Sequence, residues 1–65
     1  MNLKPGDRVR VTRRPKDGPS STVEGTVATV APNGGFSLRE DGYFTDSATL
    51  QRLYGCEQTI EVLTR

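Results

Sequence analysis

Apolar and polar residues alternate along several short stretches of this chain, with the period of two that is typical of β-strands. The longest such stretch is residues 23–31, which are rich in β-branched side chains and have turn-forming residues on both sides. Its apolar positions change parity between Val27 and Val30. We therefore expect a bulge or sharp bend between Gly25 and Ala28, or else an exposed Val30 at the strand end.

Residues 8–13 are predicted to form the first strand, because Val9 and Val11 alternate strictly with polar residues. The opposite face carries two arginines in register. Its outward residues are Arg8, Arg10 and Thr12. The preceding Pro5-Gly6-Asp7 predicts a turn, since proline fixes φ, glycine accepts positive φ and aspartate can bond a nearby backbone N–H.

Residues 14–22 are predicted to form a long loop, because Pro15, Gly18 and Pro19 interrupt any strand and no apolar residue anchors the segment. After the central strand, Asn33-Gly34 predicts a tight type I′ hairpin turn. Residues 40–42 predict a second turn of the same kind.

These turns divide a meander into short strands over residues 36–39 and 43–45. The expected core residues of these strands are Phe36, Leu38 and Phe44, with Tyr43 partly exposed on the opposite face. A last strand is predicted over residues 59–63, with Ile60 and Val62 facing inward.

Residues 47–54 depart from the period of two, because Leu50 and Leu53 lie three positions apart. Asp46 or Ser47 can cap the start of a helix, and Gly55 suits the position just past its end. We expect one or two helical turns that cover an open end of the sheet.

Together these elements predict an all-β fold: a small five-stranded barrel with one short helical turn before the last strand, in a single domain over residues 1–65. Closure of the sheet would remove exposed edges. A core of this size supplies only about 3–5 kcal/mol. Stability must therefore come from a compact closed sheet, from oligomerisation or from binding a partner.

Two segments resemble a known family. Pro5-Gly6-Asp7-Arg8-Val9-Arg10-Val11, followed by Glu24-Gly25-Thr26-Val27-Ala28-Thr29-Val30, resembles the opening strands of SH3-like barrels of the KOW and translation-protein type. The overall pattern is also similar to small proteins encoded by actinobacteria and their phages. The resemblance implies an SH3-like barrel that binds a partner. Glu24 precedes Gly25 where the KOW pattern is basic, which argues against RNA binding.

The net charge of +1 hides an asymmetry along the chain. Residues 1–20 hold six basic and two acidic residues, whereas residues 21–65 hold three basic and six acidic residues. One interpretation is a basic binding surface on the first strand and loop. The other, which we favour, is that basic and acidic strands lie side by side and neutralise each other.

The residue types present restrict the possible chemistry. The chain has no histidine and one cysteine, Cys56, so a structural zinc site is excluded and no cofactor or catalytic residue is predicted. An enzyme is the least favoured class. The lone cysteine and the absence of a signal-peptide pattern predict a cytoplasmic protein that does not span a membrane.

We therefore predict a non-enzymatic binding module whose partner is a protein, either a host protein of a phage-type modulator or a second copy paired through a strand edge. The alternative is nucleic-acid binding through the basic first strand and loop, with a tyrosine as stacking platform. The candidate partner-binding residues are Arg8, Arg10, Arg13, Arg14, Lys16, Tyr43, Arg52 and Tyr54.

Overall fold

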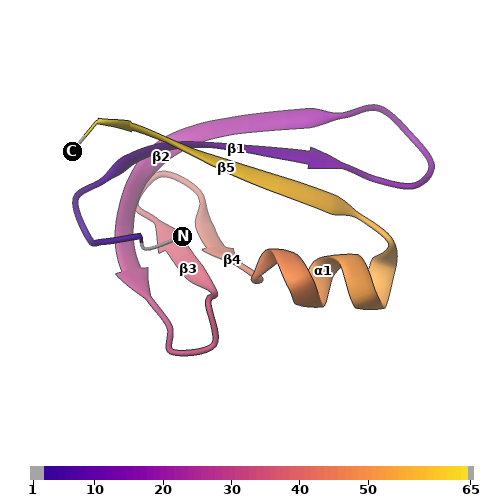
Figure 1. The fold of residues 1–65 in the computed structure, drawn as a ribbon. Helices are drawn as coiled ribbons and strands as arrows, with labels where there is room; N and C mark the ends of the chain where they lie inside the picture. Colours follow the sequence, from indigo (N-terminus) through magenta and orange to yellow (C-terminus); the bar gives the residue numbers. More distant parts are fainter. Residues whose placement is uncertain (1–2, 65) are drawn as a thin grey trace.

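The computed structural model describes residues 3–64, which form five strands and one helix (Figure 1). The elements are β1 (Arg8–Arg14), β2 (Ser21–Val30), β3 (Phe36–Leu38), β4 (Gly42–Phe44), α1 (Ser47–Tyr54) and β5 (Glu57–Thr64). The strands form one antiparallel sheet in the order β4-β3-β2-β1-β5. The all-β class, the five strands and the helix before the last strand are as predicted.

Strand β1 lies between β2 and β5, and its inward valines are the centre of the core. Val9 and Val11 are 0% and 1% exposed, as their alternation predicts. The ladder with β2 continues to Arg13 and Ser21, so the connecting loop covers only residues 15–20. The predicted 14–22 loop was too long, because polar pairs such as Thr12 and Thr22 extend the ladder without any apolar anchor.

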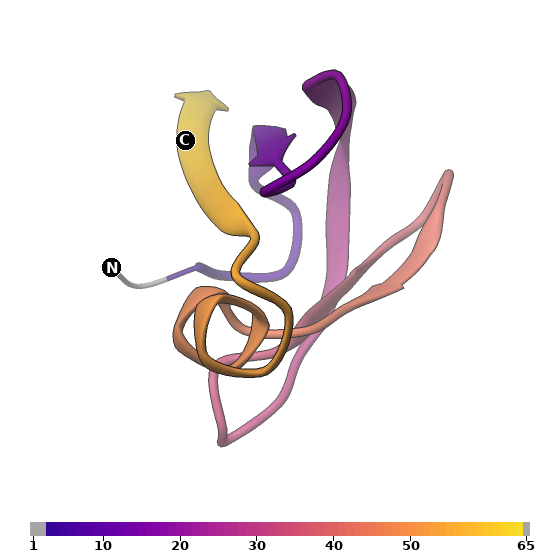
Figure 2. The ribbon, with the colours of Figure 1, turned by 90° about the vertical axis from the view of Figure 1, so that its right-hand side faces the viewer.

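Strand β2 bends where its parity changes, and the predicted bulge is confirmed by a register shift between Val27 and Thr29. Gly25 permits the close approach of β3 at this bend, because a Cβ atom there would lie 3.0 Å from Leu38 Cδ1. Val30, beyond the shift, is 39% exposed. The bend turns the β3–β4 hairpin away from the β2–β1–β5 half of the sheet (Figure 2).

The connection between β2 and β3 is not the predicted type I′ turn. Gly34 N–H donates to Ala31 O at 3.0 Å and Gly34 has φ 97°, whereas Asn33 has a negative φ. This is the pattern of a type I turn with Pro32 second, followed by a left-handed glycine. Pro32 explains the difference, because it has no N–H to close a two-residue hairpin and its fixed φ suits the second turn position.

The predicted ends of the helix and the first turn are confirmed. Asp46 accepts a hydrogen bond from Thr49 N–H at 3.1 Å, and Gly55 closes the helix with φ 65°. At the first turn, Asp7 N–H donates to Lys4 O at 3.1 Å across Pro5 and a positive-φ Gly6. The Asp7 carboxylate accepts from Lys4 N–H.

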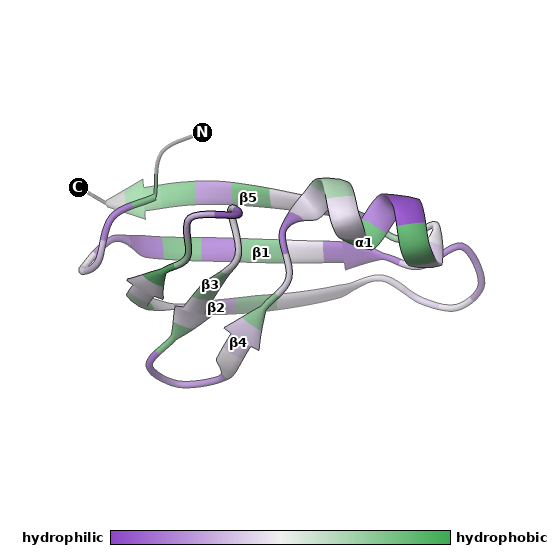
Figure 3. Ribbon diagram, turned by 90° about the horizontal axis from the view of Figure 1, so that it is seen from below, coloured by the Kyte–Doolittle hydropathy of each residue, from purple (hydrophilic) through white to green (hydrophobic). Residues whose placement is uncertain are grey.

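The core lies inside the bend of the sheet, between the β3–β4 hairpin and strands β1 and β2, along which apolar segments recur (Figure 3). Phe36 and Phe44 stack with ring centroids 5.3 Å apart, and Leu38 completes the predicted apolar set on these two strands. The described core members are Val9, Val11, Val27, Phe36, Leu38, Phe44 and Leu50. Leu53, which the period of three placed with Leu50, is instead 58% exposed.

The hydrogen-bonded ladder is open, with β4 and β5 as its two edge strands. Helix α1 connects these two edges and packs against β5 (Figure 2). Strands β3 and β4 have only three residues each, so the hairpin does not reach β5. The sheet therefore keeps two edges, and β5, eight residues long, is the longer one.

Candidate partner-binding surface

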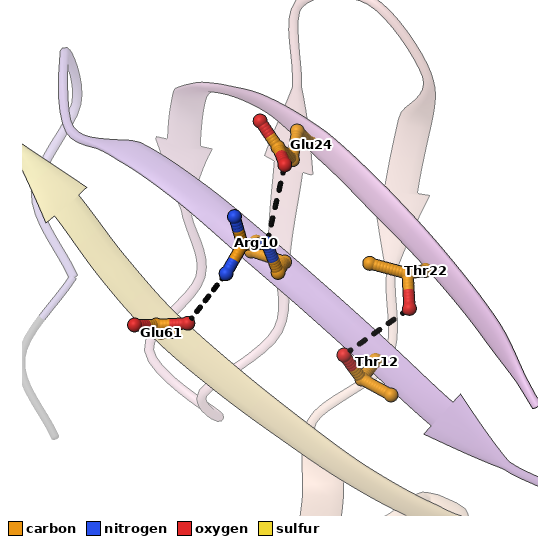
Figure 4. A network of polar contacts seen from close by, with 5 residues as sticks. All are labelled: Arg10, Thr12, Thr22, Glu24 and Glu61. Carbon is orange, nitrogen blue, oxygen red and sulfur yellow. Dashed lines mark hydrogen bonds and ion pairs between the residues drawn. The ribbon is translucent and has the colours of Figure 1, made fainter.

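The outer face of β1 is neutralised by acidic side chains on both neighbouring strands. Arg10 Nε lies 3.1 Å from Glu24 Oε2 on β2, and its Nη1 lies 3.0 Å from Glu61 Oε1 on β5 (Figure 4). The hydrogen bond that Arg10 donates to Glu24, helped by both negative charges, raises the pKa of Arg10 above its usual value. Arg10 is therefore one member of a cross-strand charge network and not a free cation.

Arg8 is held in a similar way at the other end of this face. Its Nη1 lies 3.2 Å from Glu40 Oε2 and donates to Thr26 Oγ1 at the same distance. Glu40 also accepts from Thr26 N–H at 2.9 Å, and this backbone hydrogen bond is the main reason that the pKa of Glu40 is lowered. The neutralisation that we favoured from the charge pattern matches the geometry of both arginines.

Arg13 lies on the inner side of the sheet, because it shares the parity of Val9 and Val11. Its guanidinium carbon is 4.8 Å from the centroid of the Phe44 ring, and its Nε donates to Gln58 Oε1 at 2.8 Å. Arg13 thus covers the core between β1 and β4 and has a structural role.

Gln58, which sequence reasoning missed, joins three elements behind Arg13. It is 8% exposed, and its Nε2 donates to Thr45 O at 3.0 Å and to Ser47 Oγ at 3.2 Å. The two hydrogen bonds attach β5 to the start of α1. The sequence does contain one signal for this role. Gln58 lies two positions before the inward-facing Ile60, so it faces the core as well, and a buried glutamine needs hydrogen-bond partners.

The two candidate tyrosines lie in separate places. Tyr43 on β4 is 60% exposed, and its ring passes over Gly35, where a Cβ atom would lie within 2.7 Å of Tyr43 Cζ. Tyr54 is the last residue of α1 and is 69% exposed. The two rings therefore do not form one stacking platform.

A second group of candidates comes together at the end of α1. The side chain of Lys16, from the β1–β2 loop, lies beside Gly55, 3.7 Å from the position of a Cβ atom there. Arg52 is the basic residue of the last helical turn. We define the helix-end surface as Lys16, Arg52, Leu53 and Tyr54. Within residues 3–64, neither of its cations forms an ion pair.

Arg14 lies at the end of β1, opposite Glu57 in the ladder with β5, and is exposed. It is near the β1–β2 loop but on the outer face of the sheet. The eight candidates therefore divide into five groups. Arg8 and Arg10 are paired, Arg13 covers the core, Tyr43 and Arg14 each stand alone, and Lys16, Arg52 and Tyr54 lie near the end of α1.

A pocket of about 300 Å³ lies beside β5, and no sequence pattern predicted it. It is lined by Leu3, Val30, Gly34, Ser47, Thr59 and Ile60, with Gln58 at its inner side. These residues come from five separate segments, so no local pattern in the chain predicts the pocket. The lining holds no ionisable side chain. Over the described part of the chain, no three potential metal ligands come together.

The helix of residues 47–54 is too short and too polar to cross a membrane, and it is the one helix within residues 3–64. Comparison of the chain with protein-family models, curated proteins and solved structures finds no match.

Proposed function

We propose that this protein is a non-enzymatic module that binds another protein through the helix-end surface. The observation that carries the proposal is the pair of large side chains Leu53 and Tyr54, which are 58% and 69% exposed on adjacent positions. Two cations flank them, and tyrosine and arginine are enriched at the centres of protein interfaces. A partner that offers an apolar groove edged by carboxylates would complement this surface.

The polar groups present support binding over catalysis. The pKa of Glu40 is lowered, so its carboxylate stays ionised, whereas a general acid or base at neutral pH needs a raised carboxyl pKa. Asp46 has a lowered pKa as well, because Thr49 hydrogen-bonds to its carboxylate. Both carboxylates have structural partners, and the pocket lining holds no ionisable side chain that could activate the hydroxyl of Ser47 or Thr59.

The strand order and the helix before β5 support the SH3-like assignment suggested by the opening strands. Within that assignment, a host protein of a phage-type modulator stays the proposed partner. The cytoplasm stays the proposed compartment, because the chain has a single cysteine.

Two tyrosines provide a matched test of the proposal. Tyr54→Ala and Tyr43→Ala remove the same side chain from two exposed positions, only one of which lies on the helix-end surface. In affinity capture from a host-cell extract, a partner held by the wild type should be lost with Tyr54→Ala and kept with Tyr43→Ala. Both variants should melt at nearly the wild-type temperature. Equal capture by both variants would contradict the proposal.

Nucleic-acid binding is the second candidate, and one observation favours it. Arg14, Lys16 and Arg52 form no ion pair with the described residues, and Tyr54 offers an open ring face nearby. Fluorescence anisotropy with labelled single-stranded and duplex oligonucleotides tests it at low and physiological salt. Binding that survives physiological salt and weakens in Lys16→Ala would favour nucleic acid, whereas no binding at low salt would eliminate it.

A further inference from the structure

Within residues 3–64, β5 pairs with β1 alone, and its other edge presents a regular row of backbone groups. Val27 N–H of β2 donates to Asp7 O at 2.8 Å. Because the direction of the N–H and C=O groups alternates along an antiparallel strand, those of Val9, Val11 and Arg13 also point toward β2. The alternate residues of β1 face β5, where they pair with Glu57, Thr59 and Glu61. It follows that the N–H and C=O groups of Gln58, Ile60 and Val62 point away from β1, toward the open edge.

The two edges of the sheet differ in how they are protected. Strand β4 has three residues and begins at a positive-φ glycine, so it offers little for another strand to pair with. Strand β5 has eight residues without proline or lysine. Its ladder with β1 skips Leu63 between Val62 and Thr64, so the strand is regular up to Val62.

Charge selects one way in which two such edges can pair. In an antiparallel pair about a two-fold axis, the outward-facing residues of both copies must lie opposite one another. Centring the axis on Ile60 places Thr59 opposite Glu61 and Gln58 opposite Val62. A register shifted by two residues in either direction places glutamates of the two copies opposite each other. In one such register Glu57 faces Glu61, and in the other the two copies of Glu61 face one another.

The pocket lies on the inner side of the same edge, with Ile60 in its wall. An added strand directs alternate side chains toward that side. In the register centred on Ile60, these are the second copy's Ile60 and Val62, which are apolar as the pocket is. The same association would stabilise a fold whose described core contains seven apolar residues and whose sheet does not close.

We propose that two copies of this chain associate through their β5 edges, antiparallel and centred on Ile60. The dimer would join two five-stranded sheets into one and cover the mouths of both pockets. The regular overlap runs from Gln58 to Val62, so the interface is small and the dimer should form only at high protein concentration. This proposal does not depend on the helix-end surface.

Substitution of Thr59 tests the register by sedimentation velocity from micromolar to millimolar protein. Thr59 is exposed and faces Thr12 in its own sheet, so a charge there should leave the monomer folded. In the dimer, the Thr59 side chain of each copy faces the Glu61 side chain of the other copy, so the interface contains this pair twice. Thr59→Glu should weaken the dimer about tenfold and Thr59→Lys should strengthen it several-fold, with both effects shrinking as salt is added. Unchanged melting temperatures at low concentration control for folding.

Hydrogen exchange measured by NMR gives a second, residue-level test. As the concentration rises, the amides of Gln58, Ile60 and Val62 should become protected. Those of Thr59 and Glu61, already bonded to β1, should not change. A monomer at millimolar concentration would overturn the proposal. So would a dimer that responds equally to Thr59→Glu and Thr59→Lys, or one without the alternating protection, because either would place the contact elsewhere.

Discussion

The two faces of β1 carry arginines three residues apart in entirely different surroundings. Arg10 on the outer face lies between two carboxylates, and the three side chains are 42–64% exposed. Arg13 on the inner face lies over an aromatic ring and bonds a buried amide. Both residues looked alike as candidate binding cations. Strand parity therefore decides whether a basic residue of β1 belongs to the surface or to the core.

The two surroundings also imply different energies. Exposed ion pairs contribute little, because water already solvates both partners. A donor to a buried amide contributes more, because its removal leaves an acceptor without any partner.

Phe44→Ala should be the most damaging change, because it removes both the stack with Phe36 and the ring beneath Arg13. Truncation of a buried phenylalanine costs about 3–5 kcal/mol, as much as a core of this size provides. Circular dichroism during urea titration should show a largely unfolded chain at room temperature. Tyr43→Ala, at the adjacent exposed position, is the control. Cooperative unfolding of Phe44→Ala at the wild-type midpoint would show that the ring is not part of the core.

Arg13→Met should come next, since it keeps the apolar stem and removes the guanidinium. The Gln58 side-chain oxygen would then be buried without a donor, at a cost of about 1–3 kcal/mol. The free energy of unfolding from chemical denaturation measures the loss. Gln58→Met should lower the free energy of unfolding less in the Arg13→Met background than in the wild type, because the two side chains are coupled. Fully additive losses would exclude the coupling.

Arg10→Met applies the same chemical change to the outer face and should have a much smaller effect. Both carboxylates it leaves are exposed and can be hydrated. The wild type and Arg10→Met should therefore differ little in melting temperature, and the difference should shrink further in high salt. A loss as large as that of Arg13→Met would contradict the contrast between the two faces.

Acid should produce the smallest and most gradual change on the outer face. The pKa of Glu40 is lowered from 4.5 in the folded protein, so the unfolded chain binds the proton more readily. The stabilisation from Glu40 is therefore complete above about pH 4.5 and is lost as the pH falls through the lowered pKa. Melting temperatures of the wild type and Glu40→Gln should converge in acid and differ at neutral pH. A constant difference would contradict this assignment.

Local chemistry was enough to predict most of the elements. Alternating valines identified β1, a parity change located the bend in β2, and Asp46 and Gly55 marked both ends of α1. The turn at Pro32 was wrong because the Asn-Gly signal was considered without the proline before it. Local pattern succeeds where one or two neighbouring residues decide the backbone conformation.

Features that depend on distant partners were not predicted. Strand β5 begins at Glu57, two residues earlier than expected, because backbone pairing with Arg14 continues beyond the apolar alternation. The roles of Gln58 and of the pocket need elements that are far apart in the sequence. Of the candidate surface, the sequence identified Lys16, Arg52 and Tyr54 as separate residues, and only the fold shows that they lie around one helix end.

The central position of β1 has a consequence for the order in which the chain can fold. Strand β1 is synthesised first but completes its pairing only with β5, the last strand. The hydrogen bond from Arg10 to Glu61 joins residues 51 positions apart. The β1–β2 hairpin can form early from local contacts, but one side of β1 stays unpaired until residues 57–64 have been synthesised. Such long-range pairing slows folding relative to a helical protein of the same length. During synthesis, the side of β1 that later pairs with β5 is therefore the part of this protein that a chaperone would bind.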